Sequence, residues 1–257
     1  MYTCYYKDYS PALQREMEFK VYGHAGKPCI VFAAQNGNFY DFENYGMIET
    51  IKDFIEEGRI QLFCVQSIDE ETWSGSWNYH TRIEQHERWF TYICDELLPR
   101  LHSIHNNTCK KYDDRKFLCM GVSMGAYHAL NALLRRPERF DSCIGLSGIY
   151  HASFFFPNYE DEEIYLNSPL DVLKNIDYNH PYAQKYRESK IILCCGQGNW
   201  EEEALHDANE LKNAFERLNI HAWVDLWGKD VVHDWIWWRK QLPYFLDKML
   251  EEFENDQ

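Results

Sequence analysis

Positive charge is scarce in this chain of 257 residues, which carries 26 Lys and Arg against 41 Asp and Glu and has a formal net charge of −15. A surface this acidic repels phosphate backbones and anionic lipids, and basic residues never occur more than two in a row. We therefore expect neither a nucleic-acid partner nor a membrane-surface partner.

Long hydrophobic runs are also missing, since no stretch approaches the roughly 18 apolar residues that a membrane-spanning helix needs. The first residues have neither the basic region nor the apolar core of a secretory signal. The 9 cysteines are an odd number, dispersed through apolar runs. No C-x-x-C or H-E-x-x-H spacing occurs, which argues against a metal site. These features predict a cytoplasmic protein with buried thiols and no metal or cofactor.

Apolar residues make up 45% of the chain and aromatic residues 16%, which is enough to build a substantial core. Short, almost wholly apolar runs alternate with longer amphipathic segments, as in a mostly parallel sheet covered by helices on both faces. The predicted strands are residues 18–22, 29–34, 60–66, 117–122, 143–146, 191–195 and 222–227. The predicted helices are residues 42–56, 83–102, 126–135, 203–218 and 237–252. The sequence thus predicts an α/β fold with a doubly wound sheet.

Two regions depart from this alternation. An aromatic run and the Ser10-Pro11 turn precede the first predicted strand, which favours an antiparallel hairpin at the N-terminal edge of the sheet. Residues 150–186 contain 3 of the 8 prolines and an acidic run. We interpret this region as a small cap or an irregular insertion within a single domain that spans residues 1–257.

A G-x-S-x-G motif lies between a predicted strand and a predicted helix, with Gly121, Ser123 and Gly125 at its fixed positions. A sharp strand-to-helix turn needs glycine on both sides because side chains there would collide with the neighbouring backbone. Such a turn projects the serine above the sheet at the helix N-terminus, where developing negative charge is favoured. Ser123 is therefore the candidate nucleophile.

A serine hydroxyl needs a base to take its proton, and 11 histidines compete for that role. His233 follows the last predicted strand and precedes the C-terminal helix, so it lies in a loop at the carboxyl edge of the sheet, where such sites form. We expect His128 to pack near the hinge, and His102 and His105 to lie on a solvated helix face. Five others lie in polar surroundings without distinguishing context: His80, His86, His151, His180 and His206.

The third member of such a site is a carboxylate that orients the imidazole, and in the chain order Ser–acid–His it follows the penultimate strand. That strand leads into Gly196-Gln-Gly-Asn-Trp-Glu-Glu-Glu, in which Glu201 is the first acid. We choose Glu201 on this ground. Four other acids stay open as alternatives: Glu202, Glu203, Asp207 and Asp230.

An oxyanion formed at the site needs two backbone donors. The N–H of Met124, directly after Ser123, is expected to be one of them. The second is expected from the loop after the strand at 29–34, where Gly37 lets the backbone bend and Gln35 or Asn36 supplies the N–H.

From about residue 28 to residue 250 the chain resembles the putative-esterase branch of the α/β-hydrolase superfamily, which includes esterase D-like enzymes, feruloyl and acetyl-xylan esterases and mycolyltransferases. The resemblance is carried by Gly121-Val-Ser-Met-Gly-Ala-Tyr-His-Ala-Leu, Arg136-Pro-Glu-Arg-Phe-Asp, Leu146-Ser-Gly-Ile-Tyr, Glu96-Leu-Leu-Pro and His233-Asp-Trp-Ile-Trp-Trp-Arg. It implies an α/β-hydrolase fold with Ser123 as nucleophile, His233 as base and Met124 as an oxyanion donor. Relatives often have Gly-x-x-Asp in the acid loop, and a glycine where this chain has Val232.

The sequence therefore favours a serine carboxylic-ester hydrolase that acts on a small-molecule ester. Aromatic side chains near the expected site suit aryl groups or sugar rings, and we name Phe39, Tyr40, Trp200 and Trp235 as candidates for substrate contact. An acyltransferase with the same residues and a non-catalytic interaction protein of the same fold are the alternatives. The sequence leaves open whether the chain forms a homo-oligomer.

Overall fold

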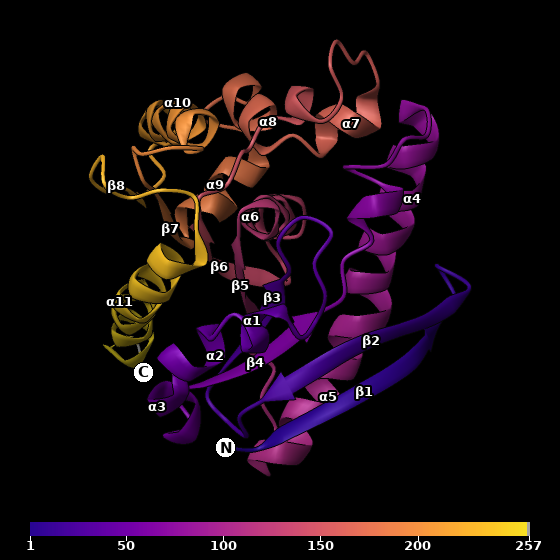
Figure 1. Cartoon of the computed structure of the whole chain (residues 1–257), viewed down its shortest axis with the longest axis vertical. Coiled ribbons are helices and arrows are strands. Elements are labelled where there is room, and N and C mark those ends of the chain that lie inside the picture. The colour runs from indigo at the N-terminus through magenta and orange to yellow at the C-terminus, as the bar shows by residue number, and fades with distance from the viewer. Residues whose placement is uncertain (256–257) are drawn as a thin grey trace.

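The strands of this protein form one mostly parallel sheet in the computed structural model, which describes residues 1–255 (Figure 1). The 8 strands follow the order β1-β2-β4-β3-β5-β6-β7-β8, in which β1 and β2 are antiparallel to their neighbours and the others are parallel. The strands are β1 (Thr3–Ser10), β2 (Arg15–Tyr22), β3 (Lys27–Phe32), β4 (Ile60–Val65), β5 (Phe117–Val122), β6 (Phe140–Leu146), β7 (Lys190–Cys195) and β8 (Ala222–Leu226). The predicted α/β class and the predicted N-terminal hairpin are confirmed.

Helices cover both faces of the sheet, as Figure 1 shows. One face packs against α1 (Asp41–Asn44), α2 (Met47–Thr50), α3 (Lys52–Glu56) and α11 (Trp235–Asn255). The other face packs against α4 (Tyr79–Thr91), α5 (Leu98–Cys109), α6 (Met124–Arg135), α8 (Pro169–Asn175), α9 (Pro181–Arg187) and α10 (Glu202–Leu218). Every residue of the central strands β3, β4 and β5 is buried or nearly so, which explains their apolar sequences.

Two predicted helices have different boundaries in the structure. Residues 42–56 form three short helices, because Gly46 adopts a left-handed φ of 77° and Ile51 a φ of −119°. The helix predicted over 83–102 instead continues from α4 through a π-helical segment, Tyr92–Leu97, into α5. Pro99 lies at the start of α5. A proline lacks the N–H of the regular ladder, and a wider π turn just before it keeps the helix continuous.

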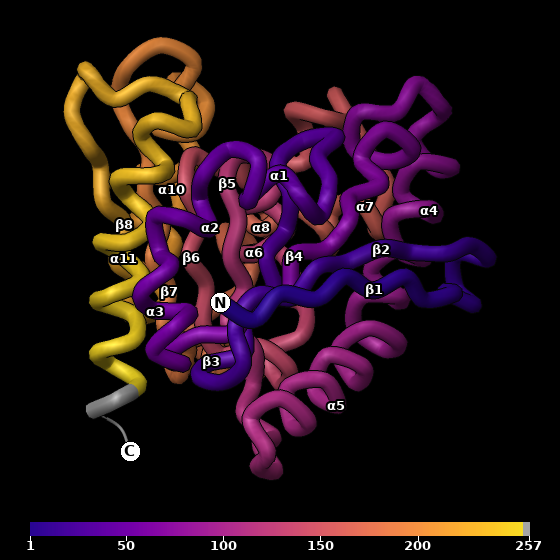
Figure 2. The backbone as a smooth tube through the Cα atoms, turned by 60° about the horizontal axis from the view of Figure 1, so that its bottom comes forward, coloured from indigo at the N-terminus to yellow at the C-terminus, as the bar shows by residue number. Residues whose placement is uncertain are grey.

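The carboxyl ends of the parallel strands meet at one edge of the sheet, and the loops that follow them are gathered there (Figure 2). The 150–186 region lies at this edge and contains α7 (Glu162–Leu166), α8 and α9. Phe156 and Ile164 pack against Met124 and Tyr127 at the start of α6. The insertion thus covers the beginning of the helix that follows Ser123. Within residues 1–255, no helix combines the length and the apolar character needed to cross a membrane.

Candidate active site

Ser123 lies on a sharp turn between β5 and α6 with the rare backbone angles φ 54° and ψ −124°. Its N–H donates a hydrogen bond of 2.8 Å to the Leu146 carbonyl on the neighbouring strand. A Cβ at Gly121 would come within 2.2 Å of the Gly125 backbone, and one at Gly125 within 2.3 Å of the Phe32 carbonyl oxygen. Both glycines of the motif are thus required by close backbone contacts, and the turn holds the serine in a strained conformation.

His233 reaches Ser123 from the loop between β8 and α11. Its Nε2 lies 2.9 Å from the Ser123 Oγ, which is hydrogen-bond distance. The Trp238 ring packs edge-on against the imidazole, with 5.0 Å between ring centroids. Two side chains that are 110 residues apart in sequence are therefore brought together with the spacing that proton transfer needs.

Glu201, at the end of the loop after β7, lies behind the imidazole and is fully buried. Its Oε1 is 3.8 Å from the His233 Nδ1 and accepts a 2.6 Å hydrogen bond from the Ser147 hydroxyl. The Trp238 Nε1 in turn donates to the Ser147 Oγ at 2.9 Å. Among the described residues, neither the Glu201 Oε2 nor the His233 Nδ1 has a hydrogen-bond partner. The Glu201 carboxylate thus approaches the His233 Nδ1 without a hydrogen bond, and its last torsion is soft enough to adjust this contact.

The loop that carries Glu201 and the loop that carries His233 are bound to each other along their backbones. The Gly198 N–H donates to the Val231 carbonyl at 2.8 Å, and the His233 N–H donates to the Asn199 carbonyl at 3.2 Å. A Cβ at Gly196 would lie 2.1 Å from the Val231 oxygen. Glycine at positions 196 and 198 therefore permits the close backbone contact between the two loops.

The four alternative acids lie elsewhere. Glu202 and Glu203 are exposed in the first turn of α10, and Asp230 is exposed in the loop after β8. Asp207 is fully buried, but its carboxylate contacts His151, with 2.8 Å from Oδ1 to Nδ1. Of the five acids considered from the sequence, the structure brings only Glu201 to His233.

The buried Asp207 forms an ion pair that belongs to the fold. Its carboxylate accepts hydrogen bonds from the backbone N–H groups of Tyr150 and His151 and from the His151 ring. The hydrogen bond to Asp207 raises the pKa of His151 above its ordinary 6.5. Burial opposes ionisation of Asp207, but the hydrogen bond and charge of His151, together with hydrogen bonds from the Tyr150 N–H and the His206 ring, outweigh it and lower its pKa below 3.8.

The Asp207–His151 pair predicts a defined pH dependence of stability. The contribution of Asp207 is present above pH 3.8 and is lost as the pH falls through its lowered pKa. The contribution of His151 is complete below pH 6.5 and is lost as the pH rises through its raised pKa. We expect Asp207→Asn to lower the free energy of unfolding by about 3 kcal/mol at pH 5.5 and by less at pH 8.5.

Thermal or urea unfolding at the two pH values measures this effect, with Asp230→Asn as the exposed control. An Asp207→Asn protein as stable as the control at pH 5.5 would contradict the interpretation.

One candidate oxyanion donor follows Ser123 directly, and the other lies in the loop after β3, where the Phe32 and Ala33 carbonyls come close to Gly125. Met124 is the first residue of α6, where N–H groups have no acceptor within the helix. The second candidate loop is a tight turn in which the Gly37 N–H donates to the Ala34 carbonyl at 2.8 Å. Asn36 in this turn has a left-handed φ of 57°.

The four aromatic side chains named for substrate contact have different surroundings. Phe39 packs edge-on against Tyr40, with ring centroids 5.0 Å apart. Trp235 stacks on Tyr45 with centroids 4.4 Å apart, so part of its ring face is already covered. Trp200 is 83% exposed and has a left-handed φ of 68°, directly before Glu201. Of the four side chains, Trp200 therefore has the ring that is most available for contact with a substrate.

The prediction for one of the other histidines is wrong. His105 is buried, not solvated, and its ring contacts Gln61 at 2.5 Å and Asp113 at 3.3 Å. His86, which had no distinguishing context in the sequence, is buried with specific partners: its Nδ1 accepts a 3.0 Å hydrogen bond from the Trp73 indole, and its Nε2 lies 3.0 Å from the Asn167 Oδ1. Burial lowers the pKa of both rings. The Gln61 partner of His105 lies 44 residues away in the sequence, a spacing that no local pattern indicates.

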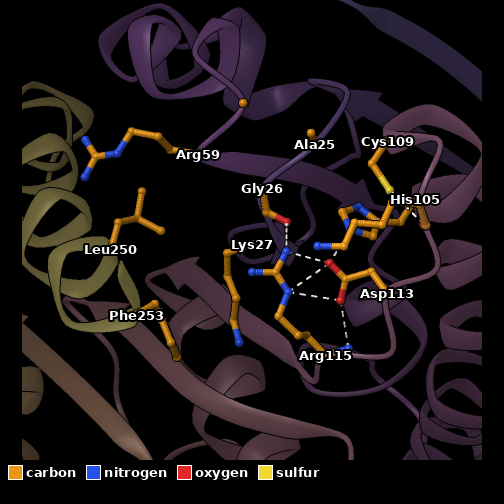
Figure 3. A pocket seen from close by; sticks show the side chains of 12 residues that line it. Ala25, Gly26, Lys27, Arg59, His105, Cys109, Asp113, Arg115, Leu250 and Phe253 are labelled. Carbon is orange, nitrogen blue, oxygen red and sulfur yellow. Dashed lines mark hydrogen bonds and ion pairs between the residues drawn. The ribbon is translucent and has the colours of Figure 1, made fainter. Parts of the chain in front are cut away.

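A cavity of about 350 Å³ lies at the opposite edge of the sheet, where β3 and β5 begin (Figure 3). Its Arg115 Nε donates to Asp113 at 2.9 Å, and its Lys27 Nζ donates to Asp141 at 2.6 Å. These cations are thus matched by carboxylates within the fold. In the part of the chain that the structure describes, no group of three or more His, Cys, Asp or Glu side chains could hold a metal ion.

Residues 10–249 match the family model described as "Putative esterase", and the chain belongs to this family. No curated protein matches the chain. The fold is similar to that of an S-formylglutathione hydrolase from Agrobacterium tumefaciens (TM-score 0.72, 14% identity, 97% of this chain and 94% of that one). It is also similar to a ferulic acid esterase (TM-score 0.69, 14% identity, 94% of each chain).

A fluorophosphonate-binding serine hydrolase from Staphylococcus aureus has the same fold (TM-score 0.68, 12% identity, 97% of this chain and 98% of that one). At such low identity these structures establish the α/β-hydrolase fold, and the family model adds the esterase class. The protein is therefore an enzyme, an esterase that hydrolyses carboxylic esters.

Proposed function

We propose that the protein hydrolyses small carboxylic esters through an acyl-enzyme on Ser123, with His233 as general base and Glu201 as the orienting acid. The observation that carries this proposal is the 2.9 Å contact between the His233 Nε2 and the Ser123 Oγ at the strained turn. A structural serine would gain nothing from a strained backbone that aims its hydroxyl at an imidazole.

The reaction proceeds in two halves. The His233 Nε2 takes the proton of Ser123 as Oγ attacks the ester carbonyl, and it returns that proton to the alkoxide as the carbonyl–oxygen bond of the ester breaks. A water molecule then attacks the acyl-enzyme, with His233 again as base, and releases the carboxylic acid and free Ser123. The buried Glu201 carboxylate stabilises the imidazolium that forms in each half.

The tetrahedral intermediates place negative charge on the former carbonyl oxygen. The Met124 N–H and the peptide N–H of Gln35 or Asn36 are the proposed donors to this oxygen. The proposed contacts to the alcohol or acyl group come from Phe39, Tyr40, Trp200 and Trp235. The exposed Trp200 is the strongest candidate among them because its ring is available for stacking.

The test is reaction with a fluorophosphonate probe, followed by peptide mass spectrometry, alongside hydrolysis of p-nitrophenyl acetate. We expect one adduct, on Ser123, and loss of hydrolysis in proportion to labelling. Hydrolysis that persists after complete labelling would overturn the proposal. A protein with neither hydrolysis nor an adduct would be a non-catalytic member of the family.

Transfer to an alcohol instead of water would use the same residues. Adding an acceptor such as glycerol or a simple sugar to the assay, and measuring ester products, separates an acyltransferase from a hydrolase.

A further inference from the structure

The loop after β3 contains a turn whose geometry depends on one residue. Ala34, Gln35, Asn36 and Gly37 form this turn, closed by the hydrogen bond from Gly37 to Ala34, and Asn36 has a φ of 57°. A positive φ at the third position is the mark of a type II turn, in which the central peptide group is flipped relative to a type I turn. The conformation of Asn36 therefore decides which way the peptide joining Gln35 and Asn36 points.

The Asn36 side chain is tied to a different loop. The Ser74 hydroxyl, in the segment between β4 and α4, donates a 2.5 Å hydrogen bond to the Asn36 Oδ1. Ser74 is itself held by Asp69, because its N–H donates to the Asp69 carbonyl at 2.9 Å and its Oγ lies 3.0 Å from the same oxygen. Ser74 thus connects the turn at Asn36 to a fixed point on the neighbouring loop.

Asp69 is in turn tied to α6. Its Oδ1 lies 2.9 Å from the His128 Nε2, and the two side chains are only 2% and 3% exposed. His128 lies on the same helix as Met124 and five residues after Ser123. A chain of contacts therefore runs from the helix that carries one proposed oxyanion donor to the turn that carries the other.

We propose that Ser74 is a positioning residue of the oxyanion hole. Through Asn36 it fixes the peptide joining Gln35 and Asn36, and through Asp69 and His128 it sets the place of this peptide relative to the Met124 N–H. Ser74 itself does not touch the reacting atoms. The inference rests on the proposed function, since it concerns the same site.

The exposure of Ser74 makes the role testable. Its hydroxyl fills no core space, so its removal leaves packing intact and its effect on the fold is small. By contrast, a shift of the second donor by about 1 Å can cost as much as about 10²-fold in rate, because stabilisation of the oxyanion depends steeply on geometry. An effect on turnover without an effect on stability is the signature of positioning.

The first experiment compares Ser74→Ala with Ser74→Thr and with Ser76→Ala, an exposed serine two residues further along the same loop. For p-nitrophenyl acetate we expect Ser74→Ala to lower kcat about 10-fold, with KM changed less than about 2-fold. Ser74→Thr keeps a hydroxyl and should recover most of the rate. Ser76→Ala should match the wild-type protein, and the Tm of all three should stay near the wild-type value.

The second measurement is inhibition by a trifluoromethyl ketone, which forms a tetrahedral oxyanion on a reactive serine. We expect its affinity to fall in Ser74→Ala by the same factor as kcat/KM, because the inhibitor uses the same donors as the transition state. Unchanged affinity together with a lower kcat would overturn the assignment to the oxyanion hole.

Substitutions at Asn36 distinguish the effect of its backbone conformation from the effect of its hydrogen bond with Ser74. Asn36→Asp retains an oxygen acceptor for Ser74, Asn36→Gly retains only the freedom to adopt a positive φ, and Asn36→Ala retains neither. We expect kcat to decrease in the order Asn, Asp, Gly, Ala. If Ser74→Ala and Asn36→Gly both turn over at the wild-type rate, the hydrogen bond between Ser74 and Asn36 is dispensable and the inference is wrong.

Failure of the inference and failure of the proposed function give different results. A wild-type protein that hydrolyses the ester through Ser123, with a fully active Ser74→Ala variant, refutes the inference alone. A wild-type protein that hydrolyses no ester and forms no Ser123 adduct refutes both.

Discussion

Replacing Ser123 by alanine is expected to lower kcat for p-nitrophenyl acetate at least roughly 10⁴-fold, because the nucleophile that carries the acyl group is gone. The variant should fold, since an alanine methyl needs less space than the hydroxymethyl group it replaces. Steady-state kinetics and circular dichroism at matched concentration measure the two properties. Fluorophosphonate labelling should disappear together with activity.

Ser103→Ala is the matched control, because Ser103 is exposed on α5, outside the loops that form the site. We expect its kcat to equal that of the wild-type protein. If Ser123→Ala retained more than about a tenth of the wild-type rate, another residue would have to be the nucleophile.

Glu201→Gln is expected to lower kcat roughly 10³- to 10⁴-fold. The amide is neutral and does not stabilise a cationic His233. Its NH₂ group also places a donor against the His233 Nδ1, which favours the tautomer with its proton on Nε2 and removes the acceptor that Ser123 needs. The amide oxygen still accepts the hydrogen bond from Ser147, so the fold should be preserved.

The control for this variant is the next residue along the chain, because Glu202 has the same side chain but is exposed. Glu202→Gln should retain wild-type kcat. The opposite pattern, with loss in Glu202→Gln and an active Glu201→Gln, would assign the acid role to the exposed neighbour.

The sequence was sufficient for those parts of the site that follow from local geometry. The two flanking glycines predict the sharp turn at Ser123. The place of His233 follows from its position after the last strand. The choice of Glu201 rested on the order of elements, and the structure separates it from Asp207, because only one of these buried acids lies at His233.

Long-range partners were beyond the sequence. Ser147, which donates to Glu201, and Trp238, which donates to Ser147, are 54 and 37 residues away from Glu201, and neither spacing is a recognisable motif. Gln61, which contacts the buried His105, is likewise 44 residues away from it. The predicted helix boundaries were wrong where a single residue, Gly46 or Pro99, changed the local geometry of an otherwise periodic segment.

The backbone contacts between the loops of Glu201 and His233 constrain how this enzyme can diversify. An insertion in either loop would break the hydrogen bond between Gly198 and Val231 and displace both Glu201 and His233. Neither loop can therefore lengthen alone. Adaptation to a new ester is then left to segments outside the loops that hold the site, such as the 150–186 region at the same edge of the sheet. We expect related enzymes with different substrates to vary in length there and to keep the last two loops constant.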